Sequence, residues 1–161
     1  DHDVAVIDAR LAKVIQHCQE IPGYELFQYG DEAGARHAIT SDDVNAHLRR
    51  LTGRDVTAKD FRTWGGTMHA ALALQSMGPA ASRREADRNI LRALDAVSER
   101  LGNTRTVCRK YYVHPEILAA YHLGLTVPTP RAVRLRRRQR PEAALRRDEV
   151  LVLQFLQERV G

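Results

Sequence analysis

The sequence lacks the motifs on which several common kinds of enzyme depend. It has no glycine-rich phosphate loop, no Cys-x-x-Cys pair and no His-Glu-x-x-His motif, and its seven histidines are scattered along the chain. Nucleotide-dependent and zinc-dependent chemistry therefore have no support. We expect an enzyme or binding protein that uses no metal and no cofactor.

Cysteines and long apolar runs are also scarce. Two cysteines in 161 residues, Cys18 and Cys108, are too few for a disulfide framework or a metal cluster, and their apolar neighbours indicate buried, reduced thiols. No secretory signal is present, and no apolar run is long enough to cross a bilayer. We expect a soluble, cytoplasmic protein, and the start at Asp1 without a methionine suggests a fragment of a longer chain.

Acidic residues are outnumbered by basic ones. The 25 lysines and arginines against 20 acids give a net charge of +5 and an isoelectric point near 9.6. A basic surface attracts polyanions, and neutralising phosphates releases counterions, which favours binding to nucleic acid. Charge alone is weak evidence, because many basic proteins never bind nucleic acid.

Helical signals dominate the chain after a short extended start. Residues 2–7 alternate like a strand, Asp8 is placed to cap a helix that Pro22-Gly23 ends, and 26–29 suits a second extended piece before a turn at 30–34. Thr40 with Asp43 then resembles a capping box. The predicted buried faces of these two helices are Leu11, Val14, Ile15 and Cys18 in the first and Val44, Leu48 and Leu51 in the second.

Further helices are predicted from Thr57 to Gly78, from Ser82 to Gly102, from about Thr104, and from Pro115 to Gly124. The predicted core positions are Phe61, Trp64, Met68, Ala71 and Leu72, then Ile90, Leu91, Leu94, Val97 and Leu101. A linker with an arginine run occupies 126–140. A last amphipathic helix from about Pro141 should pack back through Leu153, Phe155 and Leu156. The predicted fold is mainly α with a small β element at the N-terminus, divided into 1–125, 126–140 and 141–161.

The first segment that suggests chemistry runs from Lys59 through Phe61, Arg62 and Trp64 to Gly65-Gly66. Because Phe61 and Trp64 belong to the predicted apolar stripe, the guanidinium of Arg62 should lie close to the core, where its fork suits a phosphate. Pairing with Asp60 or Asp43 explains the same pattern. The two glycines weaken the helix but let another backbone approach.

The second segment is Leu101-Gly102-Asn103, followed by Arg109-Lys110-Tyr111-Tyr112-Val113-His114-Pro115. Positive neighbours stabilise a phenolate, which a tyrosine nucleophile needs. The amide of Asn103 suits either a helix cap or a donor to an oxyanion. Two partly buried aromatics and an ordinary cap are the structural alternative.

Together the two segments resemble the type IB DNA topoisomerases, particularly the bacterial, poxvirus-like branch. The string 59–65 is similar to the family segment with a catalytic arginine, which gives Arg62 that role. The string 109–115 is similar to the segment with the nucleophile, two residues before His-Pro, which selects Tyr112 over Tyr111. Asn103 fits a family position nine residues before that tyrosine, where the bacterial branch has an asparagine.

The resemblance implies a catalytic-domain fragment of the tyrosine recombinase and topoisomerase IB fold, spanning most of the chain to about Tyr121. It implies a monomeric isomerase, associated with the nucleoid, that relaxes double-stranded DNA through a 3′-phosphotyrosyl intermediate without ATP or metal. Lys59, Arg105, Arg109 and Lys110 are the candidate DNA contacts. The family's second arginine and its lysine acid would precede residue 1, so we expect the fragment alone to be weak or inactive.

Two alternatives stay open at this point. Tyrosine recombinases share the catalytic architecture, and Leu101-Gly102 matches their pattern. Asn103 and Lys59 depart from it, because a histidine is usual at both positions in those enzymes. The second alternative is a DNA-binding module without chemistry, which the basic charge alone would explain.

Overall fold

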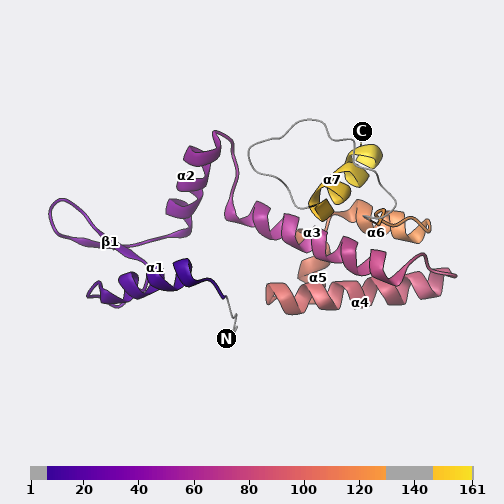
Figure 1. Cartoon of the computed structure of the whole chain (residues 1–161), viewed down its shortest axis with the longest axis horizontal. Helices are drawn as coiled ribbons and strands as arrows, with labels where there is room; N and C mark the ends of the chain where they lie inside the picture. Colours follow the sequence, from indigo (N-terminus) through magenta and orange to yellow (C-terminus); the bar gives the residue numbers. More distant parts are fainter. Residues whose placement is uncertain (1–6, 130–146, 161) are drawn as a thin grey trace. The chain divides into compact units, whose positions relative to one another are not determined.

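The computed structural model describes residues 7–129 and 147–160. The predicted fold class is confirmed, since helices predominate and a small two-stranded sheet lies near the N-terminus (Figure 1). The chain divides into two compact units, Asp1–Ala58 and Lys59–Gly161, which are described separately. The predicted strand at 2–7 lies outside the described residues except for Ile7. The arginine run and the start of the last helix also lie outside them, so the domain boundaries stay predictions.

The first unit begins with α1 (Ala9–Glu20), whose start agrees with the sequence. The carboxylate of Asp8 accepts hydrogen bonds from the amides of Arg10 and Leu11 at 2.8 and 3.1 Å. Strands β1 (Gln28–Gly30) and β2 (Arg36–Ala38) then pair antiparallel, with Tyr29 opposite His37. Asp31 holds the connecting turn, and hydrogen bonds from the ring of His37 and from turn amides lower the pKa of its carboxyl group.

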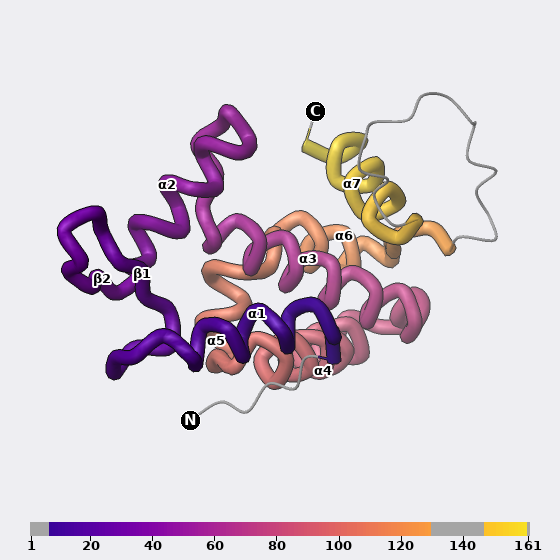
Figure 2. Tube along the Cα trace, turned by 60° about the vertical axis from the view of Figure 1, so that its left-hand side comes forward, coloured from indigo at the N-terminus to yellow at the C-terminus, as the bar shows by residue number. Residues whose placement is uncertain are grey.

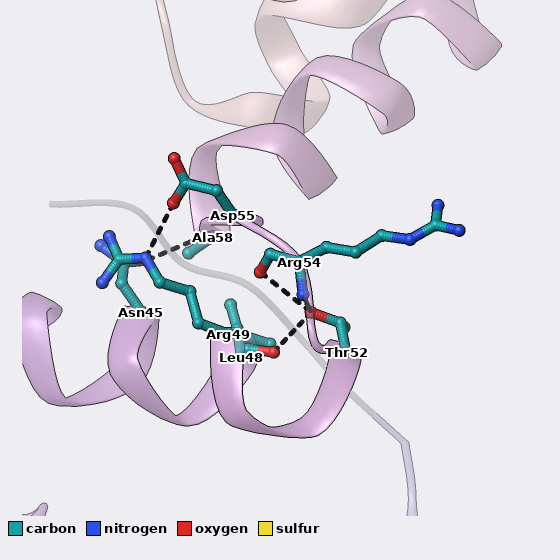
Figure 3. Close-up of polar contacts among 7 residues, drawn as sticks. All are labelled: Asn45, Leu48, Arg49, Thr52, Arg54, Asp55 and Ala58. Carbon is teal, nitrogen blue, oxygen red and sulfur yellow. Dashed lines mark hydrogen bonds and ion pairs between the residues drawn. The ribbon is translucent and has the colours of Figure 1, made fainter.

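Helix α2 (Ser41–Thr52) starts at the predicted capping box, in which Asp43 donates its amide to Thr40 Oγ1 and accepts the amide of Thr40. It ends at Gly53, whose φ of 63° lies in the left-handed region that favours glycine. Polar contacts then close the turn that follows (Figure 3). Arg49 Nε donates to Asp55 at 2.9 Å, Thr52 Oγ1 to the Leu48 carbonyl at 2.8 Å, and the Ala58 amide to Asn45 Oδ1 at 3.0 Å.

The predicted burial of the apolar faces in this unit is wrong. Val44 is 42% and Leu51 68% exposed, and none of the described residues 7–58 is buried. Cys18 is only partly buried, contrary to the prediction of a buried thiol. An amphipathic helix buries its stripe only against a second layer. Within this unit α1, α2 and the hairpin do not supply one.

The second unit is built around α3 (Ala58–Met77). The other elements are α4 (Arg83–Leu101), α5 (Arg105–Val107), the π-helical turn η1 (Cys108–Tyr112), α6 (Pro115–His122) and α7 (Arg147–Val160). Figures 1 and 2 show α4 along one side of α3, and α6 with α7 on the other side. Among the described residues, no helix has the length and apolar composition of a membrane span.

The core of this unit lies between α3, α4, α6 and α7. Its fully buried side chains include Leu74, Leu94, Val97, Cys108, Tyr121 and Val152. Two predicted core residues are in fact on the surface, because Phe61 is 57% and Leu91 40% exposed. In α7, Phe155 and Leu156 pack against the core as predicted, but Leu151 and Val152 are buried more deeply than Leu153.

A buried polar chain fastens the far end of α3. The hydroxyl of Tyr121, 1% exposed, donates to the carbonyl of Gly78 at 2.7 Å and accepts from Asn89 Nδ2 at 2.8 Å. The Tyr121 hydroxyl and the Asn89 amide lose their water on burial, and these two hydrogen bonds replace it. Loss of the hydroxyl would break both bonds at once. This chain links the end of α3, the middle of α4 and α6.

Tyr121→Phe should therefore destabilise the protein. The substitution leaves the buried Asn89 amide and the partly buried Gly78 carbonyl without this partner, which costs about 1–3 kcal/mol of the free energy of unfolding. Urea denaturation followed by circular dichroism measures the change. Tyr111→Phe, at a ring that is 48% exposed, is the matched control and should stay within about 0.5 kcal/mol of wild type. Equal stabilities for the two variants would contradict the role given to the Tyr121 hydroxyl.

Candidate active site

Arg62 lies in the first turns of α3 and reaches across to the end of α4. Its Nη2 donates to the carbonyl of Leu101 at 2.7 Å, and its guanidinium carbon lies 5.2 Å from the centre of the Tyr112 ring. The residue is exposed rather than held in the core as predicted, because Phe61 beside it faces solvent. Its position is fixed instead by a carbonyl and a ring face, both of which suit a guanidinium.

Asn103 meets Arg62 at the same carbonyl. Its Nδ2 donates to the Leu101 oxygen at 3.0 Å, so one acceptor binds donors from both side chains. Asn103 is not the N-cap of α5, since Thr104 caps that helix by accepting the amide of Val107. Its side-chain amide instead binds a carbonyl at the end of α4, so a capping role at that end stays open. Gly102 before it has a φ of 62° and turns the chain out of α4.

Tyr112 and Tyr111 have different surroundings. Tyr112 is partly buried, packs against the core and has its ring under Arg62. Tyr111 is 48% exposed and has the ammonium groups of Lys59 and Lys110 at 5.5 and 5.0 Å from its ring centre. The structure thus brings Arg62, Asn103 and Tyr112 together, and it places two of the candidate DNA contacts beside them.

The other two candidate DNA contacts differ from each other. Arg105 is already engaged, because its Nε lies 2.6 Å from a carboxylate oxygen of Asp95 on α4. Arg109 is exposed on η1, next in sequence to Lys110. The candidate DNA contacts therefore include both a solvated and an ion-paired arginine.

The sequence predicted the role of one glycine near the site only in part, and it did not predict the roles of two threonines. The predicted close approach at the glycine pair occurs at Gly66, where an added Cβ would lie 2.4 Å from the carbonyl oxygen of Tyr112. A Cβ on Gly65 would meet nothing within 4 Å. Thr63 and Thr67 contact the backbone of Tyr111 and Tyr112 through their hydroxyls. Threonine inside a helix carries no sequence signal for such a contact.

Metal ligation has no visible basis in this part of the structure. Across the described ranges 7–129 and 147–160, no cluster of three or more histidine, cysteine or acidic side chains could hold an ion. The groups beside Tyr112 are instead the guanidinium of Arg62 and the amide of Asn103, with two ammonium groups against the neighbouring Tyr111 ring. Such donors bind anions and stabilise negative charge that develops on phosphate oxygens.

Comparison with known proteins now identifies the family. Residues 2–126 match the family described as eukaryotic DNA topoisomerase I, catalytic core. The chain belongs to this family. It is also 30% identical over 114 residues to the DNA topoisomerase 1B of Acanthamoeba polyphaga mimivirus, a match that covers 66% of this chain and 34% of that protein. This topoisomerase-family chain thus corresponds to about a third of the length of that relative.

Membership of the topoisomerase I family confirms the resemblance drawn from the strings 59–65 and 109–115, both of which lie inside the matched range. It favours the topoisomerase over the recombinase alternative, in line with Asn103 and Lys59. The catalytic roles of Arg62, Asn103 and Tyr112, and the DNA contacts, stay predictions at this point.

Cys108 lies directly behind the site at 0% exposure, as predicted for a buried thiol. Burial raises the pKa of this thiol, and the positive charge of Arg62 opposes that shift only in part. A raised pKa keeps the thiol protonated at a pH where an ordinary cysteine already ionises. Since the thiolate is the reactive form, Cys108 should be inert in the folded protein.

Alkylation by iodoacetamide tests this directly. Cys108 should react on the order of a hundredfold more slowly than the partly buried Cys18, because it needs local opening as well as ionisation. Peptide mass spectrometry over a time course separates the two sites, and urea should make their rates similar. Comparable rates in the native protein would show that Cys108 is accessible.

Proposed function

We propose that the protein is a type IB DNA topoisomerase in which Tyr112 attacks a backbone phosphate. One observation carries the proposal: Arg62 and Asn103 donate to the same carbonyl oxygen, while Arg62 also covers the ring of Tyr112. Two convergent donors beside a phenol match what a phosphoryl transfer to tyrosine requires. Family membership supports the choice of this reaction.

In the proposed reaction the Tyr112 Oη forms a bond to phosphorus as the bond from phosphorus to the 5′-oxygen breaks. The phenolic proton passes to solvent or a base, and the leaving 5′-oxygen takes up a proton. The resemblance assigns that proton to a lysine before residue 1. The free strand then rotates about the intact one, and its 5′-hydroxyl attacks the 3′-phosphotyrosyl bond to restore the DNA.

Arg62 and Asn103 act on the charge of the transition state. Negative charge grows on the non-bridging oxygens as the phosphorus becomes pentacoordinate, and fixed donors stabilise it without reorganising. The Leu101 carbonyl takes one Nη2 hydrogen bond of a guanidinium that carries five N–H groups. Arg62 can therefore keep its hydrogen bond to the Leu101 carbonyl and still donate other N–H groups to a phosphate. Removing one such donor typically lowers the rate about a hundredfold or more.

The energy of the broken phosphodiester is retained in the phosphotyrosyl bond, so the reaction needs no ATP. Charge neutralisation by arginine, with hydrogen bonds from asparagine, takes the part that Mg²⁺ has in other phosphoryl transfers, so we propose activity in EDTA. Contacts through Lys59, Lys110, Arg109 and Arg105 would be to the DNA backbone and largely independent of sequence. We place the enzyme on duplex DNA in the nucleoid, as a monomer.

The decisive substitution is Tyr112→Phe in the full-length protein. A suicide DNA substrate, whose cleaved end diffuses away, should trap a covalent adduct with wild type and none with Tyr112→Phe. Denaturing gel electrophoresis separates the adduct, and plasmid relaxation in EDTA should be lost in parallel. Tyr111→Phe, the adjacent matched control, should still form the adduct, because its ring faces lysines rather than Arg62.

Adduct formation by Tyr112→Phe would remove this residue from the chemistry. A wild-type protein that binds DNA but forms no adduct would support a DNA-binding module instead. A recombinase would join defined sites in pairs, so joint products from two labelled duplexes would favour that alternative. The full-length protein is the correct sample, since the resemblance places a further arginine and lysine before residue 1.

The proposed DNA contacts predict a specific salt dependence. Each phosphate contact adds about 0.9 to the slope of log affinity against log salt concentration, so Lys59→Ala and Lys110→Ala should each lower the slope by about one. Arg105→Ala should lower it less, since Asp95 already neutralises Arg105. Fluorescence anisotropy on a duplex measures the slopes. Arg83→Ala, at the opposite end of α4, is the control, and an unchanged slope for Lys110→Ala would exclude that contact.

A further inference from the structure

The backbone that carries Tyr112 has an unusual conformation. In η1 the Val113 amide donates to the Cys108 carbonyl five residues before it, at 3.0 Å, which is the bond of a π-helix. The helix ends at Tyr112, and Val113 is extended with φ −118° and ψ 125°. The last carbonyls of any helix have no partner within it, and π-turns are rare and poorly stabilised on their own. Something outside η1 must hold this turn.

Helix α3 supplies that support through two threonines. Thr67 Oγ1 lies 3.4 Å from the carbonyl of Tyr112, and Thr63 Oγ1 lies 3.2 Å from the carbonyl of Tyr111. The single hydroxyl hydrogen of Thr63 is shared with the carbonyl of Lys59 in α3, at 3.1 Å, so Thr63 gives the weaker support. Thr67 Oγ1 also accepts the amide of His114 at 3.0 Å. The hydroxyl of Thr67, in a residue 2% exposed, thus bridges the peptide groups on both sides of Val113. The end of η1 is bonded to α3 directly after Tyr112.

Gly66 sets how closely the two backbones approach. A Cβ at this position would lie 2.4 Å from the Tyr112 carbonyl oxygen and 3.1 Å from the Tyr112 Cβ. The obstacle is backbone, which cannot rotate away like the tip of a side chain. The Tyr112 peptide would have to retreat by roughly 1 Å to reach an ordinary van der Waals separation. Gly65, one residue earlier in the same helix, faces open space.

We infer that Gly66 and Thr67 are positioning residues that set the place of the Tyr112 phenol relative to Arg62. This inference rests on the proposed function, in which Tyr112 is the nucleophile. Arg62, Gly66 and Thr67 belong to one helix, so the anion donor and the support of the nucleophile move as one body. Neither Gly66 nor Thr67 contacts the reacting atoms. They act through the Tyr112 backbone, and a misplacement near 1 Å costs about a hundredfold in rate.

The first test compares Gly66→Ala with Gly65→Ala in the full-length protein. Both changes add one methyl group and raise helix propensity equally, so they differ only in what the methyl group meets. Single-turnover cleavage of a suicide substrate is measured at saturating DNA. Gly66→Ala should lower the cleavage rate constant about a hundredfold, while Gly65→Ala leaves it unchanged. The dissociation constant for DNA, measured in parallel, should change by no more than about twofold in either variant.

The second test separates positioning from loss of stability, and it stands even if Gly66→Ala does not fold. Thr67→Val keeps the shape of the side chain but removes the hydroxyl, and the cleavage rate constant should fall about tenfold. Thr67→Ser restores the hydroxyl and should recover the rate to within about twofold of wild type. Tyr121→Phe, which removes a buried hydroxyl elsewhere in the same unit, should lower the melting temperature without slowing cleavage.

The inference is overturned if Thr67→Val cleaves as fast as wild type, or if Tyr121→Phe slows cleavage as much as Thr67→Val does. It is also overturned if a folded Gly66→Ala protein matches Gly65→Ala, or if Thr67→Ser cleaves no faster than Thr67→Val. Tyr112→Phe in the same assay separates this failure from that of the proposed function. An inactive Tyr112→Phe beside a fully active Thr67→Val refutes positioning alone, whereas an active Tyr112→Phe refutes the nucleophile and the inference with it.

Discussion

The carbonyl oxygen of Leu101 is the fixed point about which the candidate site is arranged. It belongs to the last residue of α4, where a helix leaves its carbonyls without partners and carries partial negative charge. Gly102 turns the chain away in the left-handed conformation, and the amide of Asn103 returns to the Ser98 carbonyl. This turn leaves the Leu101 oxygen available to Arg62 and Asn103 together. Two donors from distant parts of the sequence are thereby set side by side before any anion binds.

Helix α3 combines three tasks along its length. Its first turns carry Arg62 and the threonines that contact η1, its middle buries Met68, Ala71 and Leu74, and its end is tied to α6 through Gly78 and Tyr121. Since these groups share one rigid element, core packing and site geometry are mechanically coupled. A helix is better suited to this than a loop, because its own hydrogen bonds resist bending.

Local signals in the sequence predicted local structure well. The caps at Asp8, Thr40 and Ser82 and the glycine end at Gly102 depend on neighbours a few residues away, and all are present. The exposure of Phe61 and Leu91 was not predicted. The apolar stripe of a helix shows which side faces the core, but not how many of its residues the neighbouring helices cover. The π-turn depends on hydroxyls 45 residues or more distant along the chain. The meeting of Arg62, Asn103 and Tyr112 was expected from family resemblance, since charge and spacing alone left two alternatives.

The absence of buried side chains among the described residues 7–58 has a consequence for how firmly that unit holds its shape. Ordering each residue costs about 1–2 kcal/mol of backbone entropy, and burial of apolar surface is what normally offsets it. In this range the contacts come from capped helix ends, a short hairpin, exposed polar contacts and partial burial of a few apolar side chains. Amide hydrogens in α1 and α2 should exchange with solvent through frequent local openings. Amide hydrogens around Tyr121 should exchange only when the core of the second unit unfolds.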